Sequence, residues 1–202
     1  MKRRAFRIAV VSTALVAVIA LTGCSSDRDA SGTDGSSLPL VSPSSVGADL
    51  FDDVDVIFVQ MMVPHHQQAV DMSDIVLSKR GVSPDVRALA KHIKVAQQPE
   101  IEMMNAWLEK WGRIEMAEES SHHDGTDGMM TEEQMQALDE VGGPDGERLF
   151  LEGMIRHHQG AIHNAEEEIA SGKNADAVTL AKDIAGKQQA EVAAMTELLN
   201  KI

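Results

Sequence analysis

Apolar residues recur at helical spacing in four long stretches of this chain, and no stretch shows the alternation that is typical of a β-strand. Ser83-Pro84 precedes the second stretch and combines a preferred N-cap residue with a proline suited to the first helical turn. The pattern therefore predicts four amphipathic helices. They cover about residues 49–79, 83–111, 144–170 and 174–202.

The segment between the second and third stretches is polar from about 117 to 128 and then changes character. Thr131-Glu-Glu-Gln134 matches a capping box and predicts a short helix that ends near Glu140. Inside the first stretch, Pro64 removes a backbone donor and predicts a kink or a restart of the helix near His65.

The first and third stretches are copies of one pattern, 92 residues apart, because Met62-Val63-Pro64-His65-His66 aligns without a gap with Met154-Ile155-Arg156-His157-His158. The second and fourth stretches repeat a Gln-Gln-x-Glu pattern followed by Met, at an offset of 91 residues. A duplicated helical hairpin predicts an all-α fold, an antiparallel four-helix bundle. The repeated polar and methionine positions are Gln97 with Gln188, Glu100 with Glu191, and Met104 with Met195.

The N-terminus has the features of a lipoprotein signal peptide, with cations followed by an apolar run from Ile8 to Leu21. Leu21-Thr22-Gly23-Cys24 resembles a lipobox, where a signal peptidase cuts before Cys24 and the thiol is acylated. An uncleaved anchor is the alternative, but the run is short for a span of roughly 20 residues. The expected organisation is a signal peptide (1–23), a lipid-anchored flexible linker (24–47) and the bundle (48–202), divided into repeat 1 (about 48–112), an inter-repeat segment (about 113–143) and repeat 2 (about 144–202).

Charge and cysteine content narrow the chemistry. The formal net charge is −14, because Asp and Glu outnumber Lys and Arg. Binding to phosphates requires Lys and Arg, so this excess of acidic residues disfavours nucleic acid as a partner. Cys24 is the only cysteine, so the folded part has neither a disulfide nor a thiolate metal site. Soft-metal chemistry would have to use methionine and histidine.

Methionine and histidine meet on the inner faces of the duplicated helices. Met62 and His66 lie four residues apart and share a face, as do Met154 and His158. Imidazole and thioether groups together favour Cu(I) or Cu(II) over Mg²⁺ or Ca²⁺. These four residues, with Met104 and Met195 on the inward faces of the partner helices, are therefore candidate metal ligands. In the alternative reading the histidines are core residues hydrogen-bonded to Gln97 and Gln188, and the methionines, with Met104 and Met195, are core filler.

Three further groups are candidates. Met61, His65 and Met72 share an adjacent face and predict a Cu(I) site at the solvent edge; the second repeat has Gly153 and Asn164 instead and leaves His157 alone. His163 could join a surface site with Glu167. The inter-repeat segment, which also contains Asp124, predicts a site for weak, adaptable capture of copper or zinc. A solvated loop is the alternative, and Met130 alone could instead pack against the short helix that follows. The candidate residues of this segment are His122, His123, Met129 and Met130.

These motifs carry a family resemblance. The pattern Phe-x-x-x-Met-Ile/Val-x-His-His-Gln-x-Ala, the later Gln-Gln-x-Glu and Met, and the lead-in Gly128-Met129-Met130-Thr131 resemble the bacterial family called domain of unknown function 305, over about residues 48–200. The resemblance implies a ferritin-like four-helix bundle that is exported or lipid-anchored, with copper binding and copper resistance in some members. It implies no known enzymatic reaction.

The expected function is therefore a cell-envelope lipoprotein that binds copper for sequestration, tolerance or hand-over, with Cu(I) favoured and Cu(II) permitted. The lipid on Cys24 would anchor it to the outer face of the cell membrane, or to the periplasmic side of a membrane. A copper-accepting or copper-donating envelope protein is the expected partner. The main alternative is a non-metal structural or interaction module with a buried His–Gln network. A metal-dependent enzyme is the third reading and would need an open coordination position beside a pocket.

Overall fold

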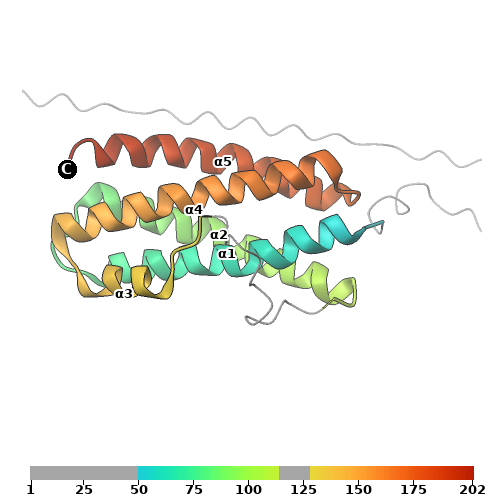
Figure 1. The fold of residues 1–202 in the computed structure, drawn as a ribbon, viewed down its shortest axis with the longest axis horizontal. Helices are drawn as coiled ribbons and strands as arrows, with labels where there is room; N and C mark the ends of the chain where they lie inside the picture. The colour runs from blue at the N-terminus through green and yellow to red at the C-terminus, as the bar shows by residue number, and fades with distance from the viewer. Residues whose placement is uncertain (1–49, 114–127) are drawn as a thin grey trace, which may run out of the picture. The chain divides into compact units, whose positions relative to one another are not determined.

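The computed structural model describes residues 50–113 and 128–202, which belong to one compact unit, Ser42–Ile202. Four long helices lie side by side and confirm the predicted all-α antiparallel bundle (Figure 1). None of the described helices is long and apolar enough to cross a membrane. The helices are α1 (Asp53–Ser78), α2 (Pro84–Lys110), the short α3 (Glu132–Glu140), α4 (Gly143–Ser171) and α5 (Ala175–Leu199).

The helices begin where side chains can cap them. Ser83 accepts a hydrogen bond from the Val86 amide at the start of α2, and Thr131 and Gln134 form the predicted capping box of α3. In contrast, the predicted restart at Pro64 is wrong, because α1 continues through this residue. Packing against both α2 and α4 holds α1 together although proline lacks a backbone donor.

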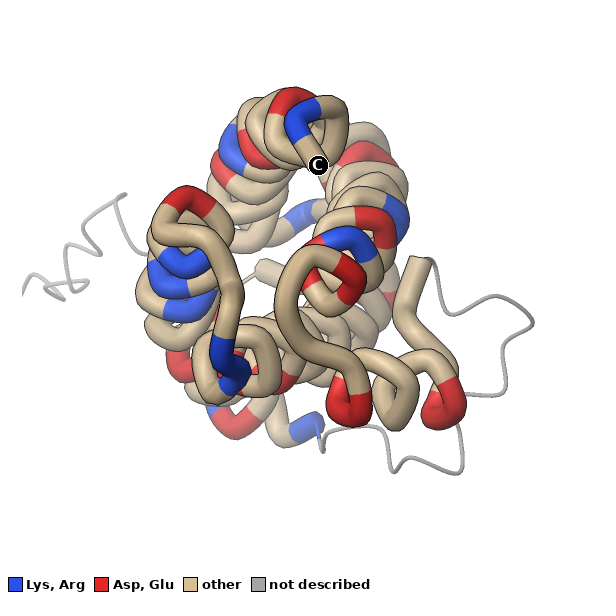
Figure 2. The backbone as a smooth tube through the Cα atoms, turned by 90° about the vertical axis from the view of Figure 1, so that its left-hand side faces the viewer, with Lys and Arg blue, Asp and Glu red and all other residues tan. Residues whose placement is uncertain are grey.

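The packing order is α2–α1–α4–α5. Helix α1 packs on α2 and α4, and α4 packs on α5, whereas α2 and α5 have few backbone contacts. Chain direction alternates along this order, as the colours in Figure 1 show. Acidic residues occur in all four long helices, whereas Lys and Arg occur in α2, α4 and α5 but not in α1. Figure 2 marks these charged positions along the backbone.

A polar layer divides the hydrophobic core into two clusters. Along α1, the residues from Val56 to Val63 and also Val70 belong to one cluster, whereas Ala69, Met72 and Val76 belong to the other, and His65 and His66 lie where the two meet. The same division occurs at His157 and His158 in α4. Each long helix therefore contributes apolar residues to both clusters and polar residues to the layer between them.

Two buried acids at equivalent repeat positions tie one repeat to the other. Asp55 in α1 accepts hydrogen bonds from the Lys173 and Asn174 amides at the start of α5, at 3.0 and 2.8 Å. Glu147 in α4 accepts from the backbone amide and the hydroxyl of Ser83 at the start of α2. Each carboxylate satisfies donors at a helix N-terminus, where the helix dipole favours negative charge.

The segment before α3 is docked on α1 and α4. The Gln68 amide donates to the Met130 carbonyl at 2.9 Å, and the Met130 amide donates to Gln68 at 2.7 Å. Gly153 makes room for the buried Met130, because a Cβ at 153 would lie 2.7 Å from its sulfur. The residue that replaces Met61 in the second repeat therefore admits a methionine from elsewhere in the chain.

Gly128 has the most restricted environment in this docked segment. Its φ is +77°, and an added Cβ would lie 2.0 Å from the backbone oxygen of Arg156. Gly128→Ala should lower the free energy of unfolding by about 2 kcal/mol or more, because a side chain is disfavoured at positive φ and also collides with α4. Chemical denaturation measures this difference.

Gly112→Ala is the matched control. Gly112 also has a positive φ, +64°, but an added Cβ would meet nothing within 4 Å. This variant should lose only about 1 kcal/mol from backbone strain. Equal losses for the two variants would contradict the close approach of Gly128 to α4.

Candidate metal centre

Four histidines form the centre of the polar layer. Helices α1 and α4 bring His65 and His157 together as buried residues, with ring centroids 3.7 Å apart. These residues occupy equivalent positions in the two repeats. The duplicated halves therefore meet at this pair of rings, and His157 is paired with His65.

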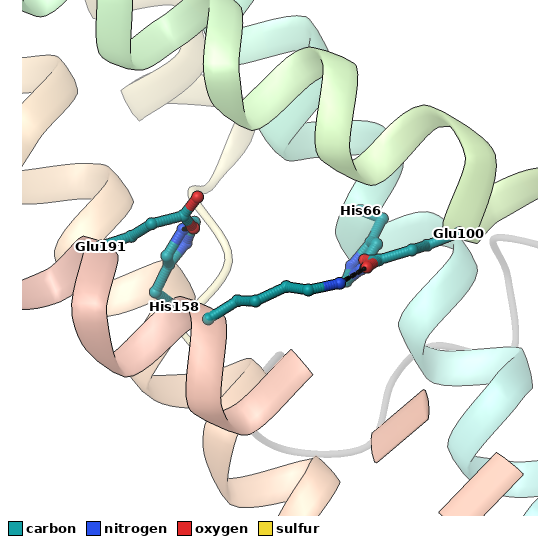
Figure 3. A network of polar contacts seen from close by, with 5 residues as sticks. His66, Glu100, His158 and Glu191 are labelled. Carbon is teal, nitrogen blue, oxygen red and sulfur yellow. Dashed lines mark hydrogen bonds and ion pairs between the residues drawn. The ribbon is translucent and has the colours of Figure 1, made fainter. Parts of the chain in front are cut away.

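The neighbouring histidines are each held by a glutamate on the helix that follows. His66 Nε2 lies 3.0 Å from Glu100 Oε2, and His158 Nε2 lies 2.7 Å from Glu191 Oε2. Figure 3 shows the two pairs, with His66 and His158 on α1 and α4 and their glutamates on α2 and α5. The partners are thus glutamates, whereas the alternative reading of the sequence paired these histidines with Gln97 and Gln188.

Glu100 determines which ring nitrogen of His66 carries the proton. Burial lowers the pKa of His66 below its usual value, so the ring is neutral at pH 7 although Glu100 opposes the shift. Burial alone would raise the pKa of Glu100, but the hydrogen bonds and charges of His66 and Lys187 lower it, so the acid is ionised. A carboxylate only accepts hydrogen bonds, so the His66 proton lies on Nε2 and Nδ1 keeps its lone pair.

Several buried polar atoms in this layer have no hydrogen-bond partner among the described residues. Such atoms are Nδ1 of His66 and His158 and amide atoms of Gln97 and Gln188. An unsatisfied buried group costs about 1–3 kcal/mol. Burial and the neighbouring histidines hold the pKa of His157 well below its usual value, so its ring is neutral.

The donor chemistry fits a soft or borderline metal ion. Metal-bound histidines commonly donate their second ring proton to a carboxylate, which fixes the tautomer and raises the basicity of the ligand. His66–Glu100 and His158–Glu191 have this arrangement, with Nδ1 free. However, no three His, Asp or Glu side chains in the described ranges are grouped to hold a metal ion. A site in this layer would need thioether ligands as well.

The core methionines lie on both sides of the layer. Met62 and Met104 belong to the cluster that contains Phe58 and Trp111. Met154 and Met195 belong to the other cluster, together with Met72 and Met130. The duplication therefore brings the four histidines into one layer but divides the methionines between its two sides.

The set Met61, His65 and Met72 is not a solvent-edge group. His65 and Met72 are buried, and Met72 is near Met130 beside Gly153. Met61 is partly exposed and lines a cavity of about 160 Å³ between α1 and α4, with Asn164 and Glu168. Met61, His65 and Met72 share one face of α1, as their spacing predicts, but α4 covers most of that face.

Glu168 beside this cavity is a buried acid that sequence analysis did not identify. No described residue donates a hydrogen bond to its carboxyl oxygens. Burial, followed by the neighbouring Asp55, raises its pKa to about 8. A protonated Glu168 can donate to the ionised Asp55, whose pKa is lowered by backbone donors that outweigh the effect of burial. The equivalent residue of the first repeat is Val76, so only one half carries this acid.

The other candidates lie away from the layer or outside the described residues. His163 is exposed, and its Nε2 is 3.7 Å from Glu167 Oε1. Met129 is partly buried beside the docked Met130. His122, His123 and Cys24 lie outside the described residues.

Comparisons with known proteins identify a family and several similar structures. The family model described as domain of unknown function (DUF305) matches residues 55–199. A DUF305 fragment from Deinococcus radiodurans is 32% identical, with a TM-score of 0.69, over 75% of this chain and 99% of that chain. A DUF305 protein from Streptomyces coelicolor, classed as secreted, is 30% identical, with a TM-score of 0.68, over 73% and 93% of the two chains.

CopM is a further structural relative. Its Cu(I)-bound form is 29% identical to this chain, with a TM-score of 0.61, over 73% of this chain and 96% of that chain. Cu(II)-bound and silver-bound forms of CopM also match. No curated protein matches the sequence.

The buried carboxyl of Glu168 predicts a pH-dependent stability. Its pKa is about 8 in the folded chain and 4.5 as an ordinary side chain, so the folded state holds the proton more tightly. The free energy of unfolding should therefore fall as pH rises from about 5 to 8, by on the order of a few kcal/mol. Glu168→Gln should remove this decline in urea denaturation experiments at several pH values.

Glu167→Gln is the control, because Glu167 is the neighbouring acid on α4 and its side chain is 69% exposed. It should retain the wild-type dependence on pH. A decline that persists in Glu168→Gln would assign the effect to another group.

Proposed function

This chain belongs to the DUF305 family, and on that premise we propose that it is a copper-binding protein of the cell envelope. The ion is its cargo, which it sequesters or hands on without a chemical reaction. One observation carries the proposal: a layer of buried histidines contains ring nitrogens that no described residue satisfies. The copper-bound and silver-bound forms of CopM support a soft metal as the ligand.

We assign the ion to the histidine layer. The free Nδ1 atoms of His66 and His158 and the ring of His157 would supply imidazole nitrogen. Met62 and Met154 precede His66 and His158 by one helical turn and would supply thioether sulfur. Thioethers favour Cu(I), and imidazoles also accept Cu(II). The other candidate residues described above remain alternative positions for the ion.

The glutamates would orient the ligands and balance the added charge. Glu100 keeps the His66 proton on Nε2, which leaves Nδ1 free without any need for deprotonation at pH 7. A buried cation is costly unless a negative charge lies close to it. The ionised Glu100, one hydrogen bond away from the ligand, provides such a charge.

The alternative function is a structural or interaction module without metal. The two His–Glu pairs favour this reading to some extent, because they satisfy one nitrogen on each ring. However, a network that only stabilised the bundle would be expected to satisfy its other buried atoms as well. The unpartnered Nδ1 atoms of His66 and His158 and the unpartnered amide of Gln97 therefore favour a ligand.

We also propose that the chain is exported and anchored to the membrane through a lipid on Cys24. The lipobox-like sequence before Cys24 supports this location, as does the family member classed as secreted. Copper would then be received from, or passed to, another protein of the envelope.

A Cu(I) competition titration against a chromogenic chelator tests the function. The informative variant is His66→Gln/His158→Gln, because glutamine can still donate a hydrogen bond to each glutamate but offers no imidazole nitrogen. We expect copper affinity to fall by roughly 100-fold or more relative to wild type, with an unchanged circular dichroism spectrum.

His122→Gln/His123→Gln removes the same number of histidines from the inter-repeat segment and should keep the wild-type affinity. The reverse result, loss of binding only in this second variant, would contradict the assignment of the ion to the histidine layer. A wild-type chain that does not compete with the chelator would exclude the copper function and favour the structural module.

A further inference from the structure

The histidine layer is buried, so an ion must pass through the protein surface to reach it. A cavity of about 200 Å³ lies between α2 and α5, the neighbouring helices of the bundle that have few backbone contacts with each other. Glu100 and Glu191 both line this cavity, and each is also bonded to a buried histidine. The two carboxylates therefore connect the cavity to the histidine layer.

The cavity wall also contains polar atoms that are available to a ligand. Gln97 and Gln188 line the cavity, and each residue is only 3% exposed. Both amide atoms of Gln97, and the Gln188 oxygen, have no hydrogen-bond partner among the described residues. The carboxylates on this wall attract a passing cation and repel an anion.

Each carboxylate also contacts a nitrogen-bearing side chain on the cavity side. Lys187 Nζ lies 3.1 Å from Glu100 Oε1, and this ion pair joins α5 to α2. His92 Nε2 lies 3.4 Å from Glu191 Oε1 and joins α2 to α5. These contacts use the glutamate oxygens that do not bond His66 and His158. An incoming metal ion would have to displace or pass these groups.

The two contacts that bridge α2 and α5, Lys187–Glu100 and His92–Glu191, are not part of the duplicated pattern. The residue equivalent to Lys187 in the first repeat is Ala96, and the residue equivalent to His92 in the second repeat is Asp183. The His–Glu pairs are present in both halves, whereas Lys187 and His92, which reach across the cavity, have no counterpart in the other half. This difference separates the bridges from the elements that build the bundle.

From this arrangement we propose that the cavity between α2 and α5 is the port through which the metal ion reaches the histidine layer. Lys187 controls entry as a displaceable counter-ion of Glu100. The inference rests on the proposed copper function and adds a route and a specificity-determining residue to it. Lys187 is 56% exposed on its side chain, so it can leave Glu100 for solvent while the 9% exposed glutamate stays in place.

Stopped-flow transfer of Cu(I) from a chromogenic chelator to the full-length chain tests the port. Lys187→Gln should take up copper about fivefold faster than wild type, the size of effect expected from one partly exposed ion pair. Lys182→Gln removes the same charge from an exposed position on α5 that does not line the cavity, and it should match wild type.

A second pair of variants tests the route by obstruction. Ala96 lines the cavity, so Ala96→Trp should slow copper uptake without changing the amount bound at equilibrium. Ala106→Trp places the same side chain at an exposed position of α2 outside the cavity and should leave the rate unchanged. Circular dichroism verifies the fold of each variant.

The outcomes separate the two proposals. Equal rates for Lys187→Gln and Lys182→Gln, together with an unchanged rate for Ala96→Trp, would overturn the port if copper is still bound at equilibrium. A wild-type chain that takes up no Cu(I) would overturn the proposed function and the port with it.

Discussion

The hydrogen bonds from His66 to Glu100 and from His158 to Glu191 are the constraint on which the rest of the core depends. They place polar groups in the middle of a four-helix bundle, where an apolar layer would be the simplest arrangement. The bundle accommodates them by dividing its apolar residues into two clusters, one on each side. A buried polar layer that is only partly satisfied is costly, so its presence in both repeats indicates a role beyond packing.

Much of the fold could be predicted from the sequence because two independent signals agreed. Apolar spacing located the four long helices, and Ser83 and Thr131 marked helix starts that the structure confirms. The alignment of His65-His66 with His157-His158 then indicated two equivalent hairpins. The restart predicted at Pro64 does not occur, because packing of α1 on two neighbours outweighs a local propensity for interruption.

The site was predictable only in part. Helical spacing identifies which residues share a face, but it does not give their partners on another helix. Gln97 and Glu100 lie three residues apart on α2, and the charged side chain of Glu100 bonds His66 while the Gln97 amide is left without a described partner. The docking of Met130 against Gly153 depends on an approach between distant segments. The repeated Glu100 and Glu191 were nevertheless visible in the Gln-Gln-x-Glu pattern and could have indicated the partners.

The central claim is that His66 and His158 each keep a proton on Nε2, which donates to a glutamate, and offer Nδ1 to the ion. Nitrogen-15 NMR of the imidazole rings, recorded as Cu(I) is added, tests this claim most directly because Cu(I) is diamagnetic and leaves the signals observable. The account predicts that the Nδ1 signals of both residues shift while their Nε2 atoms remain protonated. Unchanged Nδ1 signals in a chain that has bound Cu(I) would contradict it.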